Sequence, residues 1–210
     1  SMRNASFRSI SFGGMVKNVK RRDTECYQLA AAGEGSAALF SLNPYDGSLE
    51  QRRMNCGSIK RSFTCLAFSQ DYEHIYAGSN SGDVSVFSVK DACVVENFSV
   101  CRNGVCALRV SDGPQESLHI GGGDGTLSVW SKCIDYYGKI SFRKVNETRV
   151  DGQITSVSIR RRSGRTKATA PAPSTSVSSS SSSDEITTLV GTATGYILRS
   201  DGSESSGFRL

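Results

Sequence analysis

Short runs of alternating hydrophobic and polar residues recur along the chain, and turns rich in Gly, Asp and Asn separate them. The clearest group lies between residues 104 and 130, where the second and third runs flank the segment Gly121-Gly122-Gly123-Asp124-Gly125. Such alternation predicts β-strands, and the Gly-rich segment supplies residues that accept the positive φ of a tight reversal. The group is therefore expected to form most of a small antiparallel sheet.

The same unit occurs four times. The turn glycines Gly35, Gly82, Gly125 and Gly195 are spaced by 47, 43 and 70 residues. Removing an insert of about 26 residues from the last interval leaves about 44, the usual length of a WD-type blade. This period predicts an all-β fold, a WD-repeat-type β-propeller of about four blades. Since seven blades need about 300 residues, the 210 residues are expected to form an incomplete piece of a seven-bladed propeller.

Composition marks one interruption of the repeats. A basic, Ser-rich insert lies at about 160–185 and contains an unbroken serine run from Ser178 to Ser183. Because it has too few apolar side chains to offset the entropy lost on ordering, it is expected to be disordered. The expected segments are a basic leading segment or partial blade at 1–24, blades at 25–56, 57–100, 101–146 and 147–199, and a polar tail at 200–210.

Charge and cysteine content narrow the class of protein. The net charge of +5 is too mild to predict nucleic-acid binding, and neither a membrane-spanning apolar run nor a signal peptide is evident. Without a Cys-x-x-Cys pair, the cysteines are expected to be reduced intracellular thiols, with a disulfide framework or a metal site as alternatives. The seven are Cys26, Cys56, Cys65, Cys93, Cys101, Cys106 and Cys133.

Candidate catalytic groups have simpler structural interpretations. The 121–125 glycine cluster lacks the Gly-Lys-Ser/Thr ending of a phosphate-binding loop, so a strand turn is expected. His74 and His119 have no serine or cysteine placed to pair with them, and His119 is expected to point away from its neighbours Leu118 and Ile120. Turn aspartates are expected to accept hydrogen bonds from local backbone amides; these are Asp71, Asp83 and Asp124. We therefore predict no enzyme activity, cofactor, metal or small-molecule substrate.

One basic cluster is the candidate binding site for an acidic partner. It consists of Arg160, Arg161, Arg162, Arg165 and Lys167. A solvated loop and a nuclear-localisation patch are the alternatives. Phosphorylation of the neighbouring serines would cancel its charge.

Trp130 is the single tryptophan, and it ends the third strand of its repeat. Phe40 and Phe87 occupy the equivalent positions. Each is expected to pack between neighbouring blades.

These repeats resemble the WD-repeat superfamily and, more narrowly, its cilia- and flagella-associated members. The narrower resemblance covers roughly 25–160 and 187–199. It rests on residues 32–36, 57–61, 78, 81–84, 104–105, 121, 152–157 and 190–192. It implies the second half of the first of two seven-bladed propellers, in a protein bound to tubulin inside axonemal doublet microtubules. The insert and the absence of Trp-Asp strand endings depart from the pattern.

The expected function is a non-enzymatic protein-interaction scaffold. By resemblance, its partners are tubulin and other axonemal proteins, and its location is the cytoplasm, in the axoneme of a cilium or flagellum, where it stabilises doublets. The alternative is a WD-repeat adaptor in another cytoplasmic complex, of the trafficking or ubiquitin-ligase type. No nucleic-acid or membrane partner is expected. An open piece of a propeller also exposes unpaired sheet edges, which favours self-association.

Overall fold

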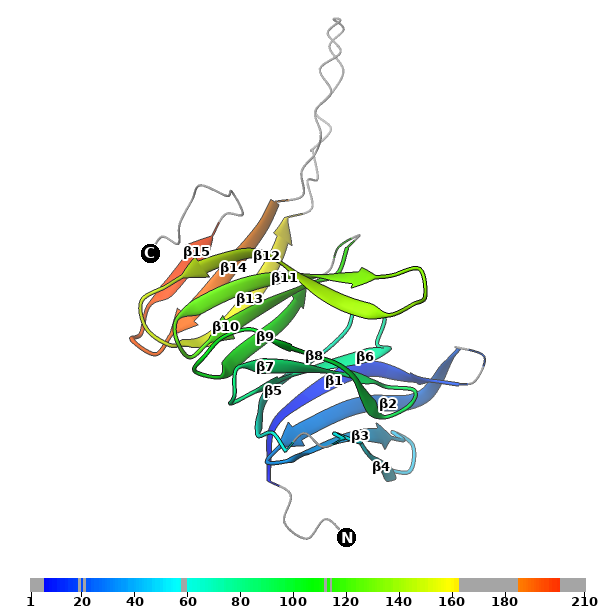
Figure 1. The fold of residues 1–210 in the computed structure, drawn as a ribbon. Helices are drawn as coiled ribbons and strands as arrows, with labels where there is room; N and C mark the ends of the chain where they lie inside the picture. Colours follow the sequence, from blue (N-terminus) through cyan, green and yellow to red (C-terminus); the bar gives the residue numbers. More distant parts are fainter. Residues whose placement is uncertain are drawn as a thin grey trace, which may run out of the picture.

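The computed structural model describes residues 6–18, 20, 22–57, 60–111, 113, 115–162 and 185–200. They form four antiparallel sheets in which strands that follow each other in the chain are hydrogen-bonded neighbours (Figure 1). This all-β array of blade-like sheets confirms the predicted fold class.

The sheets follow one another in chain order. The first holds β1 (Phe7–Lys17), β2 (Asp23–Gly33), β3 (Ser36–Leu42) and β4 (Leu49–Arg53). The second holds β5 (Phe63–Phe68), β6 (His74–Ser79), β7 (Asp83–Ser88) and β8 (Cys93–Ser99). The third holds β9 (Val105–Ser111), β10 (Ser117–Gly122), β11 (Thr126–Ile134) and β12 (Ile140–Arg149). The fourth holds β13 (Ile154–Arg162), β14 (Glu185–Thr192) and β15 (Ile197–Ser200).

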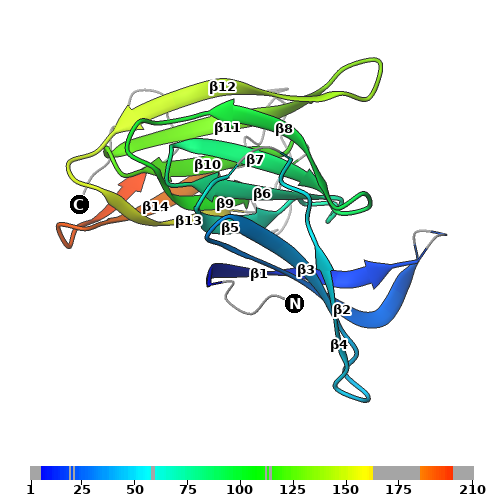
Figure 2. The same ribbon diagram turned by 60° about the horizontal axis from the view of Figure 1, so that its bottom comes forward.

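The four sheets stack face to face as an open array (Figures 1 and 2). The leading strands β1, β5, β9 and β13 contact one another in sequence. The fourth strands lie farther out, and β4 is exposed along its whole length. The first and fourth sheets therefore each have one face that no other described sheet covers.

Strand pairing sets the limits of the sheets. The leading segment supplies β1, which pairs with β2, and β12 runs through Arg149. The expected insert began near residue 160, but β13 continues through Arg160, Arg161 and Arg162 because these residues pair with β14. Residues 163–184, which belong to the insert expected to be disordered, lie outside the described residues, as does the tail from 201 onward.

The four repeat glycines have the backbone conformation that the sequence predicted. Gly35, Gly82, Gly125 and Gly195 have φ of 62°, 87°, 81° and 87°. Each lies in the turn between the second and third strands of its sheet, where a side chain would strain the backbone.

Hydrophobic side chains fill the space between successive sheets. Between the first and second sheets, Ala30 and Leu39 pack with Phe63 and Phe87. Between the second and third, the cluster includes Tyr76, Val84, Leu118 and Ile120. Between the third and fourth, it includes Ala107, Leu127, Ile154, Val157 and Val190. The core is therefore a series of layers between sheets.

Glycines at the end of the second strand allow neighbouring sheets to approach closely. A Cβ built on Gly78 would lie 2.5 Å from Val105 Cγ1 of the third sheet. A Cβ on Gly121 would lie 2.4 Å from Ile154 Cγ2 of the fourth. Because neither site has room for a methyl group, the glycines here serve packing between sheets.

Gly121→Ala is expected to lower the free energy of unfolding by about 1–3 kcal/mol through overpacking. Urea unfolding followed by circular dichroism measures the effect. Gly113→Ala is the control, since a Cβ there meets nothing closer than 3.5 Å. Equal stability of the two variants would contradict the packing role of Gly121.

Candidate protein-interaction surface

The chain reverses at alternate edges of each sheet. The turns that join the first strand to the second and the third strand to the fourth therefore lie along one edge of the array, which we call the rim. They are the β1–β2, β3–β4, β5–β6, β7–β8, β9–β10 and β11–β12 turns. Figure 2 shows the β11–β12 hairpin projecting at this edge. At its end, Tyr136 and Tyr137 are 96% and 91% exposed, and Ile134 beside them is 63% exposed. The hairpin thus presents an apolar and aromatic surface to solvent.

Hydrogen bonds within the turn hold this tip in one conformation. The Asp135 Oδ1 accepts from the backbone N–H groups of Tyr137 (2.9 Å) and Lys139 (2.8 Å). The Asp135 carbonyl accepts from the N–H of Gly138 at 3.0 Å, and Gly138 has a φ of 79°. Tyrosines are enriched among the residues that dominate protein interfaces, and a preorganised loop loses little entropy on binding. The geometry suits contact with a protein.

A buried charged cluster, the Glu116 cluster, lies between the second and third sheets at the base of this hairpin. The side chains of Glu116 and Lys132 are each only 8% exposed, and their charged atoms are 3.5 Å apart. The second carboxylate oxygen of Glu116 accepts from the Gln70 N–H at 2.7 Å, and Asp71 lies 3.7 Å from Lys132 Nζ. These contacts join the β5–β6 turn to the third sheet.

Tyr76 completes the Glu116 cluster. Its ring is fully buried, and its hydroxyl donates a hydrogen bond to the Glu116 carboxylate. Burial, followed by the Glu116 charge, raises the pKa of Tyr76. The hydroxyl therefore stays protonated as a donor at neutral pH, and the cluster acts as a structural connection.

A cavity of about 570 Å³ opens at the rim between the first and second sheets. Its lining includes Lys17, Arg52, His74 and Lys90. Lys17 Nζ donates to the Asp71 carbonyl at 2.9 Å, and Arg52 donates to the Lys90 carbonyl at 2.8 Å. The sequence analysis did not find this site, because its residues come from separate strands and share no motif.

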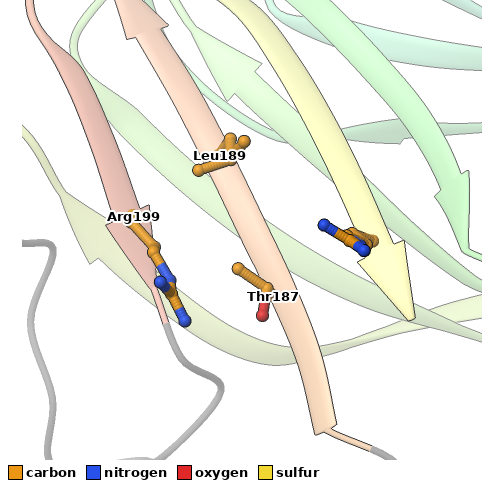
Figure 3. Close-up of a pocket in the computed structure, with 4 residues that line it drawn as sticks. Thr187, Leu189 and Arg199 are labelled. Atoms are coloured by element: carbon orange, nitrogen blue, oxygen red, sulfur yellow. The ribbon is translucent and has the colours of Figure 1, made fainter. Parts of the chain in front are cut away.

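Three residues of the predicted basic cluster, Arg160, Arg161 and Arg162, are among those that the structure describes. Arg160 lies on the uncovered face of the fourth sheet, beside a cavity of about 310 Å³ that Thr187, Leu189 and Arg199 also line (Figure 3). Arg161 and Arg162 belong to β13, whereas Arg165 and Lys167 lie outside the described residues. The contact of this cluster with an acidic partner stays a prediction.

The turn aspartates differ from one another. As expected, Asp71 and Asp124 accept from the backbone N–H groups of Glu73 and Thr126 at 2.9 and 3.0 Å. Asp83 is buried and instead accepts from the Ser79 hydroxyl and forms a 3.1 Å ion pair with Arg61. Alternation along the chain could not reveal this distant pairing.

The two histidines lie in different sheets. His74 is half-buried in β6, and burial and the Lys132 charge lower its pKa. His119 lies in β10, opposite Arg109, on the face away from Leu118 and Ile120. It is 6% exposed, and its Nδ1 has no hydrogen-bond partner among the described residues. Burial lowers the pKa of His119 to about 4, so the ring is neutral in the folded protein.

The stability of the protein is expected to fall as the pH drops from 6.5 to 4. In the unfolded chain His119 takes up a proton near pH 6.5, whereas the folded state resists protonation down to about pH 4. Its contribution is complete above pH 6.5 and declines by about 3 kcal/mol at pH 4. His119→Leu should flatten this part of a urea-unfolding profile measured against pH. An unchanged slope would show that the carboxylates govern it.

The cysteines are all unpaired. Burial raises the pKa of Cys65 to about 11, which leaves its thiol protonated and unreactive at neutral pH. The described residues contain no group of three His, Cys, Asp or Glu side chains arranged to hold a metal ion. The described part of the chain also has no helix long and apolar enough to cross a membrane.

Comparison with known proteins supports the fold and the resemblance. No family model matches the chain. The chain is 23% identical over 134 residues to "Cilia- and flagella-associated protein 52" of Chlamydomonas reinhardtii. The matched region covers 63% of this chain and 20% of that protein. Among solved structures, the match to "Structure of U3-55K" covers 96% of this chain and 50% of that chain, with a TM-score of 0.59 and 11% identity. "Crystal structure of RRP9 WD40 repeats" covers 73% of this chain and 42% of its own, with a TM-score of 0.49 and 13% identity.

The chain thus spans about a fifth of the ciliary relative and half of the first structural neighbour. The resemblance to a cilia- and flagella-associated protein that the repeats predicted is confirmed, at 23% sequence identity. The chain has a propeller-type array of β-sheets.

Proposed function

We propose that the protein is a non-enzymatic scaffold that binds other proteins through the rim, with the β11–β12 hairpin as its principal contact. The observation that carries the proposal is the exposed pair Tyr136 and Tyr137 on a turn whose backbone is hydrogen-bonded to Asp135. A turn whose backbone is already ordered before binding presents aromatic contact area at a reduced entropic cost.

We further propose that its partners belong to the axoneme of a cilium or flagellum, with tubulin among them, and that binding stabilises doublet microtubules. The 134-residue similarity to a ciliary and flagellar protein supports this location. The basic side chains Lys139 and Arg143 on the same hairpin are exposed and suit an acidic protein surface.

The test uses the whole protein, tagged in cells that build flagella. Isolated axonemes are washed with detergent and high salt, and the tag is then measured in the remaining doublets. Retention is expected, because high salt screens the exposed charges of Lys139 and Arg143 but does not weaken the apolar contact made by Tyr136 and Tyr137. Loss in the wash, or absence from flagella, would contradict the axonemal role and favour an adaptor in another cytoplasmic complex.

The hairpin is tested in the same assay. Tyr136→Ser with Tyr137→Ser is expected to reduce retention at least tenfold, as loss of two central aromatic contacts does at other interfaces. Tyr45→Ser is the matched control, because Tyr45 is 77% exposed on the β3–β4 turn of the same rim. Equal retention of both variants would exclude the hairpin as the principal contact.

A further inference from the structure

The cavity of about 570 Å³ at the rim, which we call the rim cavity, has two described sheets as its walls, the first and the second. Three cationic side chains line it, each from a different element. They are Lys17 of β1, Arg52 of β4 and Lys90 of the β7–β8 turn. Glu73 is the one carboxylate in the described lining, so positive charge is in excess. All three cations are exposed and can therefore reach a ligand that enters from solvent.

These cations form no ion pair with a carboxylate in the part of the chain that the structure describes. Lys17 Nζ donates to the backbone carbonyl of Asp71 at 2.9 Å, while the Asp71 carboxylate lies 3.7 Å from Lys132 Nζ. Arg52 Nη1 donates to the backbone carbonyl of Lys90 at 2.8 Å. Because an ammonium group has three N–H donors and a guanidinium group five, both side chains retain donors for an anion. The rim cavity is therefore a positively charged site with hydrogen-bonding capacity to spare.

Strand order sets the spacing of two of these cations. The hydrogen bonds to Asp71 and Lys90 hold Lys17 at the β5–β6 turn and Arg52 at the β7–β8 turn. The order β5-β6-β7-β8 places these turns two strand spacings apart, about 10 Å. One phosphate or carboxylate group cannot span that distance. Glutamates three residues apart in a polyproline-II peptide lie about 9 Å apart on the same side, because this conformation has about three residues per turn.

Apolar side chains complete the lining of the rim cavity. They are Met15, Val16, Tyr72 and Val89. A peptide that carries aliphatic side chains between its carboxylates suits both the cations and this apolar surface. An inorganic anion or a nucleotide offers no such combination of separated negative charges and aliphatic groups. The lining therefore favours an acidic peptide as the occupant.

We propose that the rim cavity binds an acidic segment of a partner protein in an extended conformation, through two carboxylates about 10 Å apart. One carboxylate bonds Lys17, and the other bonds Arg52 and Lys90. Aliphatic side chains of the segment pack against Tyr72 and Val89. The site adds a second contact to the rim and does not involve the β11–β12 hairpin.

Fluorescence anisotropy of the labelled peptide Gly-Leu-Glu-Val-Ala-Glu-Leu-Gly with the purified chain tests the proposal. Saturable binding is expected, and the same peptide with glutamine in place of both glutamates should bind at least about tenfold more weakly. Arg52→Glu is expected to raise the Kd of the acidic peptide at least about tenfold, because it places a like charge against a carboxylate. Lys17→Glu should do the same. Since both residues are exposed, the variants should keep the circular dichroism spectrum of the unaltered protein.

Arg53→Glu is the matched control, because Arg53 is exposed on the same strand but does not line the rim cavity. It is expected to change the Kd less than about twofold at physiological salt, which screens charges outside the contact. Tyr136→Ser with Tyr137→Ser should leave peptide binding unchanged, so this proposal and the role of the hairpin can fail independently. The absence of saturable binding, or equal losses for Arg52→Glu and Arg53→Glu, would overturn the proposal. So would displacement of the peptide by an equal concentration of ATP, which would assign the cavity to a phosphate ligand.

Discussion

Glu116→Ala is expected to lower the free energy of unfolding by about 3–5 kcal/mol, the cost of leaving a buried charge without its partner. The side chain of Lys132 is 8% exposed and, among the described residues, would retain Asp71 as its only carboxylate partner, at 3.7 Å. The Tyr76 hydroxyl and the Gln70 N–H would lose their acceptor as well. Urea unfolding followed by the fluorescence of the single tryptophan measures this loss.

The matched control removes both charges. Glu116→Leu with Lys132→Met is expected to lose less stability than Glu116→Ala, because no buried charge is left without its partner, although the Tyr76 hydroxyl and the Gln70 N–H still lose their acceptor. If Glu116→Ala loses no more stability than the double variant, the view that the cluster stabilises the contact between the second and third sheets would be contradicted.

Trp130→Ala is expected to destabilise the protein by about 3 kcal/mol, at the lower end of the range for large aromatic residues because the indole is only partly buried. Its ring lies 4.9 Å from that of Phe98 in the second sheet, and its Nε1 donates to Ser128 Oγ at 2.9 Å. The melting temperature should fall by about 6–12 °C, which calorimetry measures.

Trp130→Phe is the control, since phenylalanine occupies the equivalent positions 40 and 87. It should keep the ring contact with Phe98 and lose less than half as much stability. A melting temperature unchanged by Trp130→Ala would contradict the packing role that the sequence predicted and the structure shows.

Local information in the sequence determined the repeat. Alternation such as that of Val84 and Val86 about Ser85 predicts strands, and the four repeat glycines predict turns, because strand pleating and positive φ act within a few residues. Together they predicted the sheets and the position of Trp130 between them. The seven-bladed propeller to which these sheets were assigned stays a prediction.

Long-range contacts depended on the tertiary structure. Alternation assigned His119 to the face away from Leu118 but could not say that its Nδ1 would be buried with no hydrogen-bond partner in the described part of the chain. The pairing of Glu116 with Lys132 and Tyr76, and that of Asp83 with Arg61, join segments that no motif connects. No feature of the sequence distinguishes Tyr136 and Tyr137 from other tyrosines in loops.

The sequence by itself determined that the chain forms repeated β-sheets, because hydrophobic alternation and glycine turns are local properties. Only the tertiary structure decided which faces are covered. Phe40 and Phe87 occupy the same place in their repeats, yet Phe87 is 1% exposed and Phe40 remains partly open. The difference arises because burial depends on the neighbouring sheet, and the position of that sheet is not encoded within the repeat.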